Sequence, residues 1–200
     1  FKQTYKNWEV IFWDNKSTDN SKKKFKKFKD KRLKYYLAKK HCHLYGARNL
    51  AIKKCKGSFI TFLDADDLWL PSRLEEQIKF MKLNKQYKII YTNYYVLKND
   101  KKYLFKSYLP EGYITQRLLD RYDLGISTVM LKRELFVKNF FSKKLNIIGD
   151  FDFFINLSLK QEIGCIQKPL SIYRKHSSNF SIKNSQLHIN EISEWILHNK

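Results

Sequence analysis

Three carboxylates follow an apolar, strand-like run in the first half of the chain. Residues 59–63 are apolar or β-branched, and the run ends at the acidic segment 64–67, a D-x-D pattern. Carboxylates this close repel one another unless a positive charge offsets them. Mg²⁺ and Mn²⁺ suit such oxygen ligands and fill their remaining positions with water or phosphate oxygens. The segment therefore predicts a divalent-cation site facing a phosphate, with Asp66 as the first ligand and Asp64 as the second. A solvated acidic turn fits the same pattern, and Asp67 fits a helix cap.

A second strand-like run ends in a similar way near the start of the chain. Residues 8–13 are mostly apolar and aromatic, and they lead into Asp14, Asn15 and a polar loop that extends to Asp19. In open α/β sheets, ligands bind outside the carboxyl ends of the strands. We therefore expect Asp14 and Asn15 to lie on the same side of the sheet as the first acidic segment.

These acidic loops need a sheet that brings strand ends together, and the hydrophobic pattern predicts one. Strands are expected at 8–13, 33–37 and 59–63, alternating with helices at about 19–28, 45–55 and 71–83. This alternation is typical of a mostly parallel sheet with helices on both faces. The second half predicts strands at 88–96, 103–108 and 126–131, helices at 113–121 and 150–159, and a strand pair over 165–173 bent at Pro169. No repeat or linker divides the chain, so a single α/β, Rossmann-like domain is expected.

Composition limits the classes of protein to be considered. Hydrophobic residues make up 43% of the 200 residues and aromatic residues 16%, which is enough to build a core. Cys42, Cys55 and Cys165 are widely spaced, which indicates neither a disulfide framework nor a zinc site and suits a reducing cytosol. The net charge of +21 favours anionic partners, although a compositional bias of the source genome would produce the same excess. No uncharged apolar run approaches the ~20 residues that a membrane-spanning helix needs.

Several segments, in the same order along the chain, resemble the inverting family 2 glycosyltransferases with the GT-A fold. The passage 3–10 resembles the family's Q-T-Y-x-x-(W/F)-E-(L/V) pattern, and residues 14–21 resemble its D-D-G-S-T-D loop, which touches the nucleotide base. Four further segments extend the resemblance to about residue 178, nearly the whole chain. They are 46–51 (A-R-N-x-(G/A)), 57–67 continued by Pro71 and Arg73 (the metal-binding strand), 149–154 (E-D-(Y/F)-(D/E)-(L/F)-W) and 169–176 (P-L-x-x-Y-R-x-H).

The resemblance implies a nucleotide-diphosphate sugar as donor, a UDP-sugar first of all, and inversion at the anomeric carbon. Asp150 falls on the catalytic base, which would accept the proton of an acceptor hydroxyl. Mn²⁺ or Mg²⁺ would neutralise charge on the leaving diphosphate. The resemblance assigns this metal to Asp66, Asp64 and His176, and the donor contacts to Asp14, Asn15, Arg48, Asp64, Arg174 and His176.

The chain departs from the family pattern at three places. Asn15 stands where the family usually has a second Asp, which leaves the base preference open, and Gly149 replaces the usual Glu before Asp150. The family's first strand, V-S-V-I-I-P-x-Y-N, has no counterpart here. We therefore interpret residues 1–200 as a family 2 catalytic domain that lacks its N-terminal strand, with its C-terminal end also a candidate for truncation. Alone, such a fragment is expected to be unstable or inactive.

The leading hypothesis is a hexosyl- or hexosaminyltransferase that acts on a saccharide or lipid-linked acceptor in bacterial surface polysaccharide or lipooligosaccharide synthesis. It would be cytoplasmic, with the anionic inner face of the cytoplasmic membrane as a peripheral partner. The lysine-rich segment 22–40, with its interleaved aromatics, leaves open a basic nucleic-acid-binding module, the less favoured alternative. A further alternative is a decayed member of the family that binds the nucleotide without turnover. Taken singly, Asp150 also fits a helix N-cap and His176 a surface imidazole.

Overall fold

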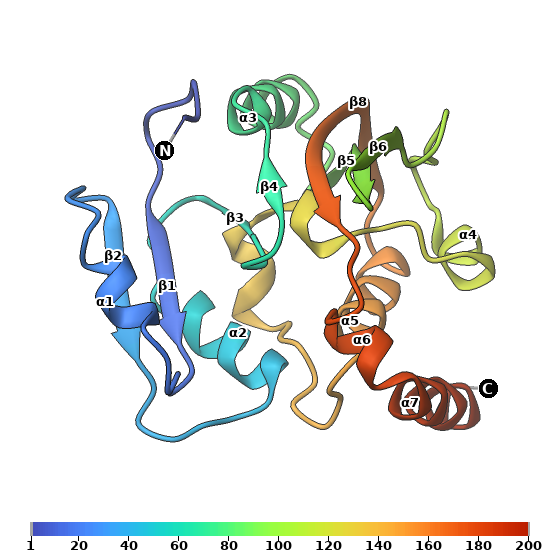
Figure 1. Ribbon diagram of the computed structural model, residues 1–200. Helices are drawn as coiled ribbons and strands as arrows, with labels where there is room; N and C mark the ends of the chain where they lie inside the picture. Colours follow the sequence, from blue (N-terminus) through green and yellow to red (C-terminus); the bar gives the residue numbers. More distant parts are fainter. Residues whose placement is uncertain (1, 200) are drawn as a thin grey trace.

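The first half of the chain alternates strands and helices much as its pattern predicts. The computed structural model describes residues 2–199 (Figure 1). Along the chain, β1 (Val10–Asp14) is followed by α1 (Ser21–Phe25) and β2 (Leu33–Leu37). The next elements are α2 (Leu44–Ile52) and β3 (Phe59–Thr61). A two-residue strand that was not predicted, β4 (Leu68–Trp69), precedes α3 (Arg73–Leu83).

The second half confirms most of the predicted elements and corrects others. Its members are β5 (Ile89–Lys98), β6 (Lys101–Leu104), α4 (Thr115–Asp120), the 3-10 helix η1 (Ile126–Thr128), β7 (Met130–Lys132), the 3-10 helix η2 (Arg133–Val137), α5 (Gly149–Ser158) and β8 (Ile163–Arg174), followed by α6 (Phe180–Lys183) and α7 (Ser185–His198). The strand predicted over 126–131 begins as a 3-10 turn. The predicted strand pair over 165–173 is one strand, β8, whose pairing with β5 shifts register close to Pro169 because proline cannot donate to the ladder.

The α/β class is confirmed, but parallel pairing is less extensive than the sequence predicts. β1 and β2 form a parallel two-stranded sheet, and the larger sheet has the order β3-β7-β5-β8-β4 with β6 added on β5. In the larger sheet only β5 and β8 run parallel, so it is mixed rather than mostly parallel. β5 and β8 are joined by a long connection that contains α4 and α5, as a parallel pair requires. The β5–β6 hairpin instead turns in two residues, Asn99 and Asp100, which both have positive φ.

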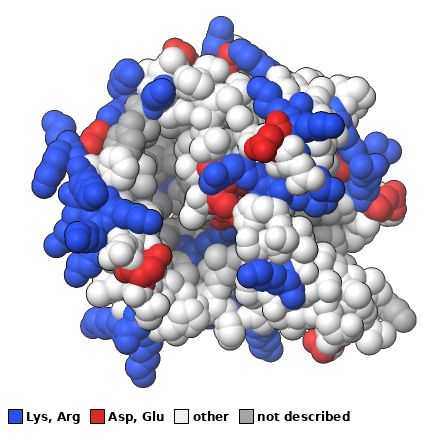
Figure 2. Space-filling view, in the orientation of Figure 1, with Lys and Arg blue, Asp and Glu red and all other residues white. Residues whose placement is uncertain are grey.

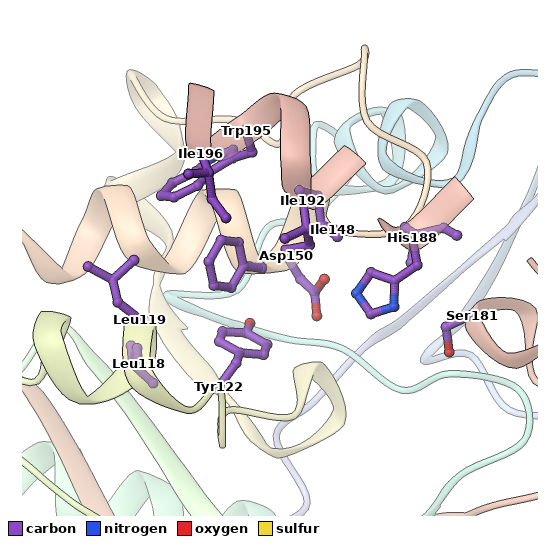
Figure 3. Close-up of a pocket in the computed structure, with 12 residues that line it drawn as sticks. Leu118, Leu119, Tyr122, Ile148, Asp150, Ser181, His188, Ile192, Trp195 and Ile196 are labelled. Carbon is purple, nitrogen blue, oxygen red and sulfur yellow. The ribbon is translucent and has the colours of Figure 1, made fainter. Parts of the chain in front are cut away.

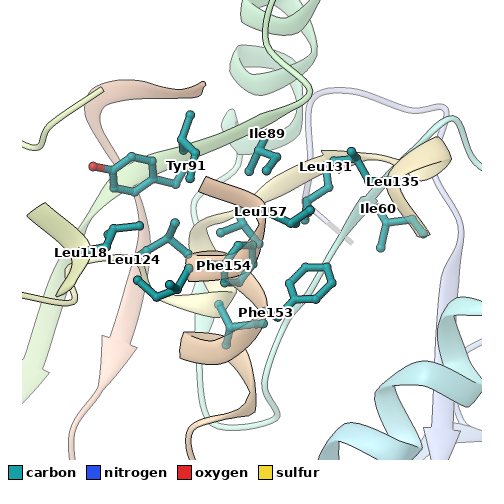
Figure 4. Close-up of a cluster of buried hydrophobic side chains, with 14 of the residues drawn as sticks. Ile60, Ile89, Tyr91, Leu118, Leu124, Leu131, Leu135, Phe153, Phe154 and Leu157 are labelled. Atoms are coloured by element: carbon teal, nitrogen blue, oxygen red, sulfur yellow. The ribbon is translucent and has the colours of Figure 1, made fainter. Parts of the chain in front are cut away.

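Helices cover both faces of the larger sheet. Ile89 and Leu131 point toward α5, where Phe153, Phe154 and Leu157 complete the main core (Figure 4). Their neighbours Ile90 and Met130 point the opposite way and pack against three residues of α3, Leu74, Ile78 and Met81. Successive residues of a strand face opposite sides of a sheet, so Ile89 of β5 packs in the core with α5 and Ile90 packs in the cluster with α3.

The two sheets share no strand pairing within residues 2–199. In the described residues, β1 has β2 as its strand partner and β3 has β7, so no ladder joins β1 to β3. Side-chain bonds cross between them instead: Glu9 accepts from the backbone N–H groups of Lys56 and Gly57 at 2.6 and 3.1 Å. Gln3 likewise accepts from Leu74 N at 3.0 Å and donates to Leu70 O at 2.8 Å. These bonds position the β1–β2 unit against the rest of the domain.

Candidate functional site

The acidic segment after β3 borders a cavity of about 470 Å³. Arg48 of α2, Asp64 and Asp66 of the segment, and Asp150 at the start of α5 all line it. These residues are far apart in the sequence, and the fold brings them to one place, as predicted for strand-end ligand sites. Figure 2 shows acidic side chains beside a hollow in this face of the molecule, while Lys and Arg gather over α1 and β2 at the left.

Asp150 is the second residue of α5, and its half-buried carboxylate opens onto this cavity. The Tyr45 hydroxyl lies 2.8 Å from Asp150 Oδ1 and 2.5 Å from Ile147 O, so it can donate to either. Burial raises the pKa of the Asp150 carboxyl, and the neighbouring Arg48 cation and Tyr45 hydroxyl offset this only in part. A carboxylate with a raised pKa in a cavity is suited to accept a proton. The helix N-cap alternative is wrong, because the N-cap is Ile148 and Asp150 lies inside the helix.

Gly149 leaves room for the Tyr45 ring. A Cβ at this position would lie 2.4 Å from Tyr45 Cδ2 and 2.5 Å from Cε2, closer than real Cβ contacts. Tyr45 is 2% exposed and packs against Phe141, with ring centroids 5.5 Å apart. The departure from the family's usual Glu therefore has a local cause, because the tyrosine that bonds to Asp150 occupies the space of that side chain.

Arg48 lies between two carboxylates. Its Nη2 is 2.6 Å from Asp64 Oδ1, and its side chain is only 10% exposed. Burial lowers the pKa of Arg48, but Asp64 and Asp150 outweigh burial and raise it overall. One oxygen of Asp64 is thus engaged by a cation of the protein itself, so Asp64 fits a metal ligand less well than the sequence suggests.

Asp66 is grouped with residues that follow β8. Its Oδ2 lies 3.2 Å from His176 Nε2 and accepts from Asn179 Nδ2 at 3.0 Å. Arg174 Nε donates to the backbone carbonyl of Asp66. Within residues 2–199 no three His, Cys, Asp or Glu side chains are arranged to hold a metal ion by themselves. Asp66 and His176 nevertheless fit an ion that takes one or two protein ligands and completes its shell with water and phosphate.

Asp67 has a different role from the predicted helix cap. Its Oδ1 accepts from Arg174 N at 3.2 Å, and burial raises the pKa of its carboxyl. β4 separates Asp67 from α3, whose N-cap is Ser72, so the cap prediction is wrong. The carboxylate ties the end of β8 to the acidic segment and thereby helps to place Arg174 and His176.

Asp14 and Asn15 lie at the carboxyl end of β1, as predicted, but neither is among the described residues that line the cavity. Asp14 accepts from Ser17 N at 2.7 Å and from the Tyr35 hydroxyl. Asn15 Nδ2 donates to Cys42 O at 2.6 Å, and Cys42 N donates back to Asn15 Oδ1 at 3.2 Å. These bonds order the loops next to the cavity, and the contact with a nucleotide base stays a prediction.

The irregular second half contributes lining residues that were not predicted. Tyr94, Tyr122, Asp123 and Tyr173 all border the cavity, together with the loop 124–128. Tyr173 belongs to the segment 169–176 that resembles the family, but Tyr94, Tyr122 and Asp123 belong to no local motif, because the folding of β5, η1 and β8 around α5 is what brings them there. Asn179 is the exception, since it follows His176 closely and could have been suspected as its partner.

An α/β domain whose strand-end cavity gathers carboxylates has the architecture of the GT-A class, and solved structures confirm that fold. The chain is similar to S. aureus TarS 1–349 in complex with UDP, with a TM-score of 0.73 and 20% identity over 88% of this chain and 54% of that one. Residues 1–177 match the family model "Glycosyl transferase family 2". The chain belongs to this family of glycosyltransferases.

Curated relatives support the same assignment. The chain is 38% identical, over 67% of its length and 52% of the relative's, to the UDP-Glc:alpha-D-GlcNAc-diphosphoundecaprenol beta-1,3-glucosyltransferase WfgD of Escherichia coli. It is 35% identical, over 98% of its length and 29% of the relative's, to an uncharacterized glycosyltransferase of Rickettsia bellii. The chain thus spans about half the length of the first relative and less than a third of the second.

Proposed function

We propose that the protein transfers a hexosyl or hexosaminyl group, with inversion, from a nucleotide-diphosphate sugar to a lipid-linked saccharide in bacterial surface-glycan synthesis. The observation that carries this proposal is that Asp150, with its raised pKa, opens onto the same cavity as Asp64 and Asp66. A UDP-sugar is the proposed donor. The name of the E. coli relative supports these substrate classes, since it includes a UDP-linked donor and a diphosphoundecaprenol-linked acceptor.

In the proposed reaction, Asp150 accepts the proton of an acceptor hydroxyl as its oxygen attacks the anomeric carbon in line with the departing diphosphate. The Tyr45 hydroxyl, 2.8 Å from Oδ1, restrains the carboxylate and stabilises its ionised form. Arg48 supplies positive charge between Asp64 and Asp150. Asp66 and His176 would hold a Mn²⁺ or Mg²⁺ ion, which when bound acts as a Lewis acid on the diphosphate oxygens.

Donor binding should depend on a divalent ion and on Asp66. We expect calorimetry to show that UDP binds with Mn²⁺ and binds at least tenfold more weakly after chelation, because the diphosphate and Asp66 then repel each other. The Asp66→Ala variant should lose the Mn²⁺-dependent increase in UDP affinity, whereas the surface variant Asp120→Ala should keep it. UDP binding that is unchanged by chelation would contradict the metal proposal.

The same variants separate the alternatives that the sequence left open. Oligonucleotide affinity that falls steeply with salt and survives Asp66→Ala would favour the nucleic-acid-binding module. Intact metal-dependent UDP binding without transfer to any acceptor would identify a member that binds its donor but does not turn it over.

We also propose that the basic face over α1 and β2 binds an anionic membrane surface, at the cytoplasmic face of the membrane. No residue of α1 is buried, and the helix carries Lys22, Lys23 and Lys24 (Figure 2). Within residues 2–199, no helix has the length and apolar character needed to span a bilayer. Peripheral attraction to anionic lipid would bring the enzyme to a lipid-linked acceptor.

Reversing these three charges should weaken membrane binding. Each lysine near an anionic surface contributes ~1 kcal/mol, so Lys22→Glu, Lys23→Glu and Lys24→Glu together should lower the partition onto phosphatidylglycerol vesicles at least a hundredfold. Sedimentation with vesicles measures this. Glutamate at Lys98, Lys101 and Lys102 of the β5–β6 hairpin makes the same change in net charge and is the matched control. Equal losses in the two triple variants would count against a specific basic face.

A further inference from the structure

A second cavity, of about 530 Å³, adjoins the first. It lies between α4, α5 and α7, and four residues line both cavities: Tyr122, Ile147, Asp150 and Ser181. Figure 3 shows the Asp150 carboxylate directed into this space, with Tyr122 beside it. The proposed base therefore stands at the junction of two spaces, one beside the acidic segment and one beside α7.

The second cavity is lined chiefly by hydrocarbon. Its apolar residues include Leu118 and Leu119 of α4, Phe151 of α5, and Ile192, Trp195 and Ile196 of α7. The aromatic rings form a continuous wall, since Tyr122 and Phe151 have centroids 5.3 Å apart and Phe151 and Trp195 have centroids 4.9 Å apart. Trp195 is itself fixed by an Nε1 bond of 2.9 Å to Asp152 Oδ1. Such a wall can bury an apolar ligand but cannot satisfy many hydroxyl groups.

Three polar residues that line this cavity, Tyr122, Asp150 and Ser181, also line the first. The Tyr122 hydroxyl is buried and has no hydrogen-bond partner within residues 2–199. Buried polar groups are nearly always paired, so this oxygen is available to a group that the protein does not supply. His188 faces the same space as Asp150 and is the lining side chain that can carry a positive charge (Figure 3). Hydroxyl and phosphate groups of a ligand would find partners here and not deeper in the cavity.

We propose that the second cavity holds the apolar chain of a lipid-linked acceptor while the acceptor's sugar lies at Asp150 and Tyr122. This inference rests on the proposed function and adds where the acceptor binds and which part of it is recognised. The second cavity is continuous with the Asp150 carboxylate, its walls are apolar, and most of its polar groups lie at the junction. These features fit one amphipathic molecule, polar at one end and hydrocarbon at the other. α7, which supplies half of the apolar residues named above, lies outside the residues 1–177 that match the family model.

Two acceptors with the same sugar diphosphate test this, one ending in a long isoprenoid chain and one in a methyl group, both in detergent. The unchanged protein should have a lower KM for the long-chain acceptor. The double variant Leu119→Asn with Ile196→Asn should raise that KM about tenfold or more, because both apolar side chains line the cavity. The KM for the methyl acceptor should stay within about twofold. Both residues are 43% or more exposed, so the substitutions are compatible with folding.

The matched control is Leu159→Asn with Leu197→Asn, two leucines that are 63% and 65% exposed and do not line the cavity. It should keep the preference for the long-chain acceptor. Equal KM values for the two acceptors in the unchanged protein would overturn the inference while transfer itself would sustain the proposed function. A preference that both double variants retain would also overturn it. Transfer to neither acceptor would refute the proposed function, and the inference with it.

Discussion

Asp150→Asn should lower kcat by about 10²–10⁴-fold and leave UDP affinity unchanged. The amide cannot take the proton of the acceptor hydroxyl, but it keeps the shape of the carboxylate and can still accept from Tyr45. UDP release during transfer measures kcat, and calorimetry measures UDP binding. Asp152→Asn is the matched control, because it removes a carboxylate from the same first turn of α5, does not line the cavity, and leaves an amide oxygen that can still accept from Trp195 Nε1. Similar losses in the two variants would point to a helix-charge effect rather than a base.

The pH dependence follows from the same residue. Because the folded pKa of Asp150 is raised, kcat/KM should rise with pH through a midpoint above the ~3.9 of a free aspartate, and Asp150→Asn should abolish this limb. The contribution of Asp150 to folding stability changes with pH in the opposite direction. The protonated form is the one that the fold favours, so this group stabilises the domain at low pH, and its contribution is lost as pH rises through the folded pKa. A midpoint at or below ~3.9 would contradict the raised pKa.

Gly149→Ala should damage both the fold and the reaction. The added methyl would meet the Tyr45 ring at 2.4 Å, and that ring cannot move without losing its packing on Phe141 and its hydroxyl's contacts with Ile147 O and Asp150. Overpacking of this kind costs about 1–3 kcal/mol, or ~2–12 °C in Tm for a domain of this size. Both the melting temperature measured by calorimetry and kcat should fall.

Two comparisons make this expectation specific. Gly46→Ala on α2 has only ordinary contacts, 3.4 Å from Cys42 Sγ, and should be neutral or slightly stabilising because alanine favours a helix. In a Tyr45→Ala background, the further cost of Gly149→Ala should nearly vanish, because the clashing ring is gone. A full cost in that background would show that the glycine is needed for another reason.

Residues whose roles follow from their own strand or helix could be predicted from the sequence. Asp64 and Asp66 could be predicted because they follow directly after an apolar, strand-like run, whereas Asp150 was predicted from the resemblance of residues 149–154 to the family's helix start. The structure brings all three to one cavity. The limit of this reasoning shows at Asp67: its partner is Arg174 N at the end of β8, and no local pattern reveals a bond across that separation.

The neighbours of these residues could not be predicted. Tyr45 reads as an ordinary helix residue, and only the packing of α2 on α5 shows that it contacts both Gly149 and Asp150. The mixed sheet has the same cause, since the antiparallel pairs β3–β7, β5–β7 and β4–β8 join strands far apart in the sequence.

The absence of strand pairing between the two sheets has a consequence for cooperativity. β1 and β2 are joined to the rest of the domain by side-chain bonds such as those of Gln3 and Glu9 and by apolar packing of Tyr5 and Trp8, rather than by a continuous ladder. Units joined in this way can open at a lower free energy than the core around α5. If Asp14 and Asn15 contact the donor base while Asp66 contacts its diphosphate, a single ligand spans both units. Donor binding would then raise the free energy needed to separate the two units, and amide hydrogen exchange in β1 should become slower when the donor is bound.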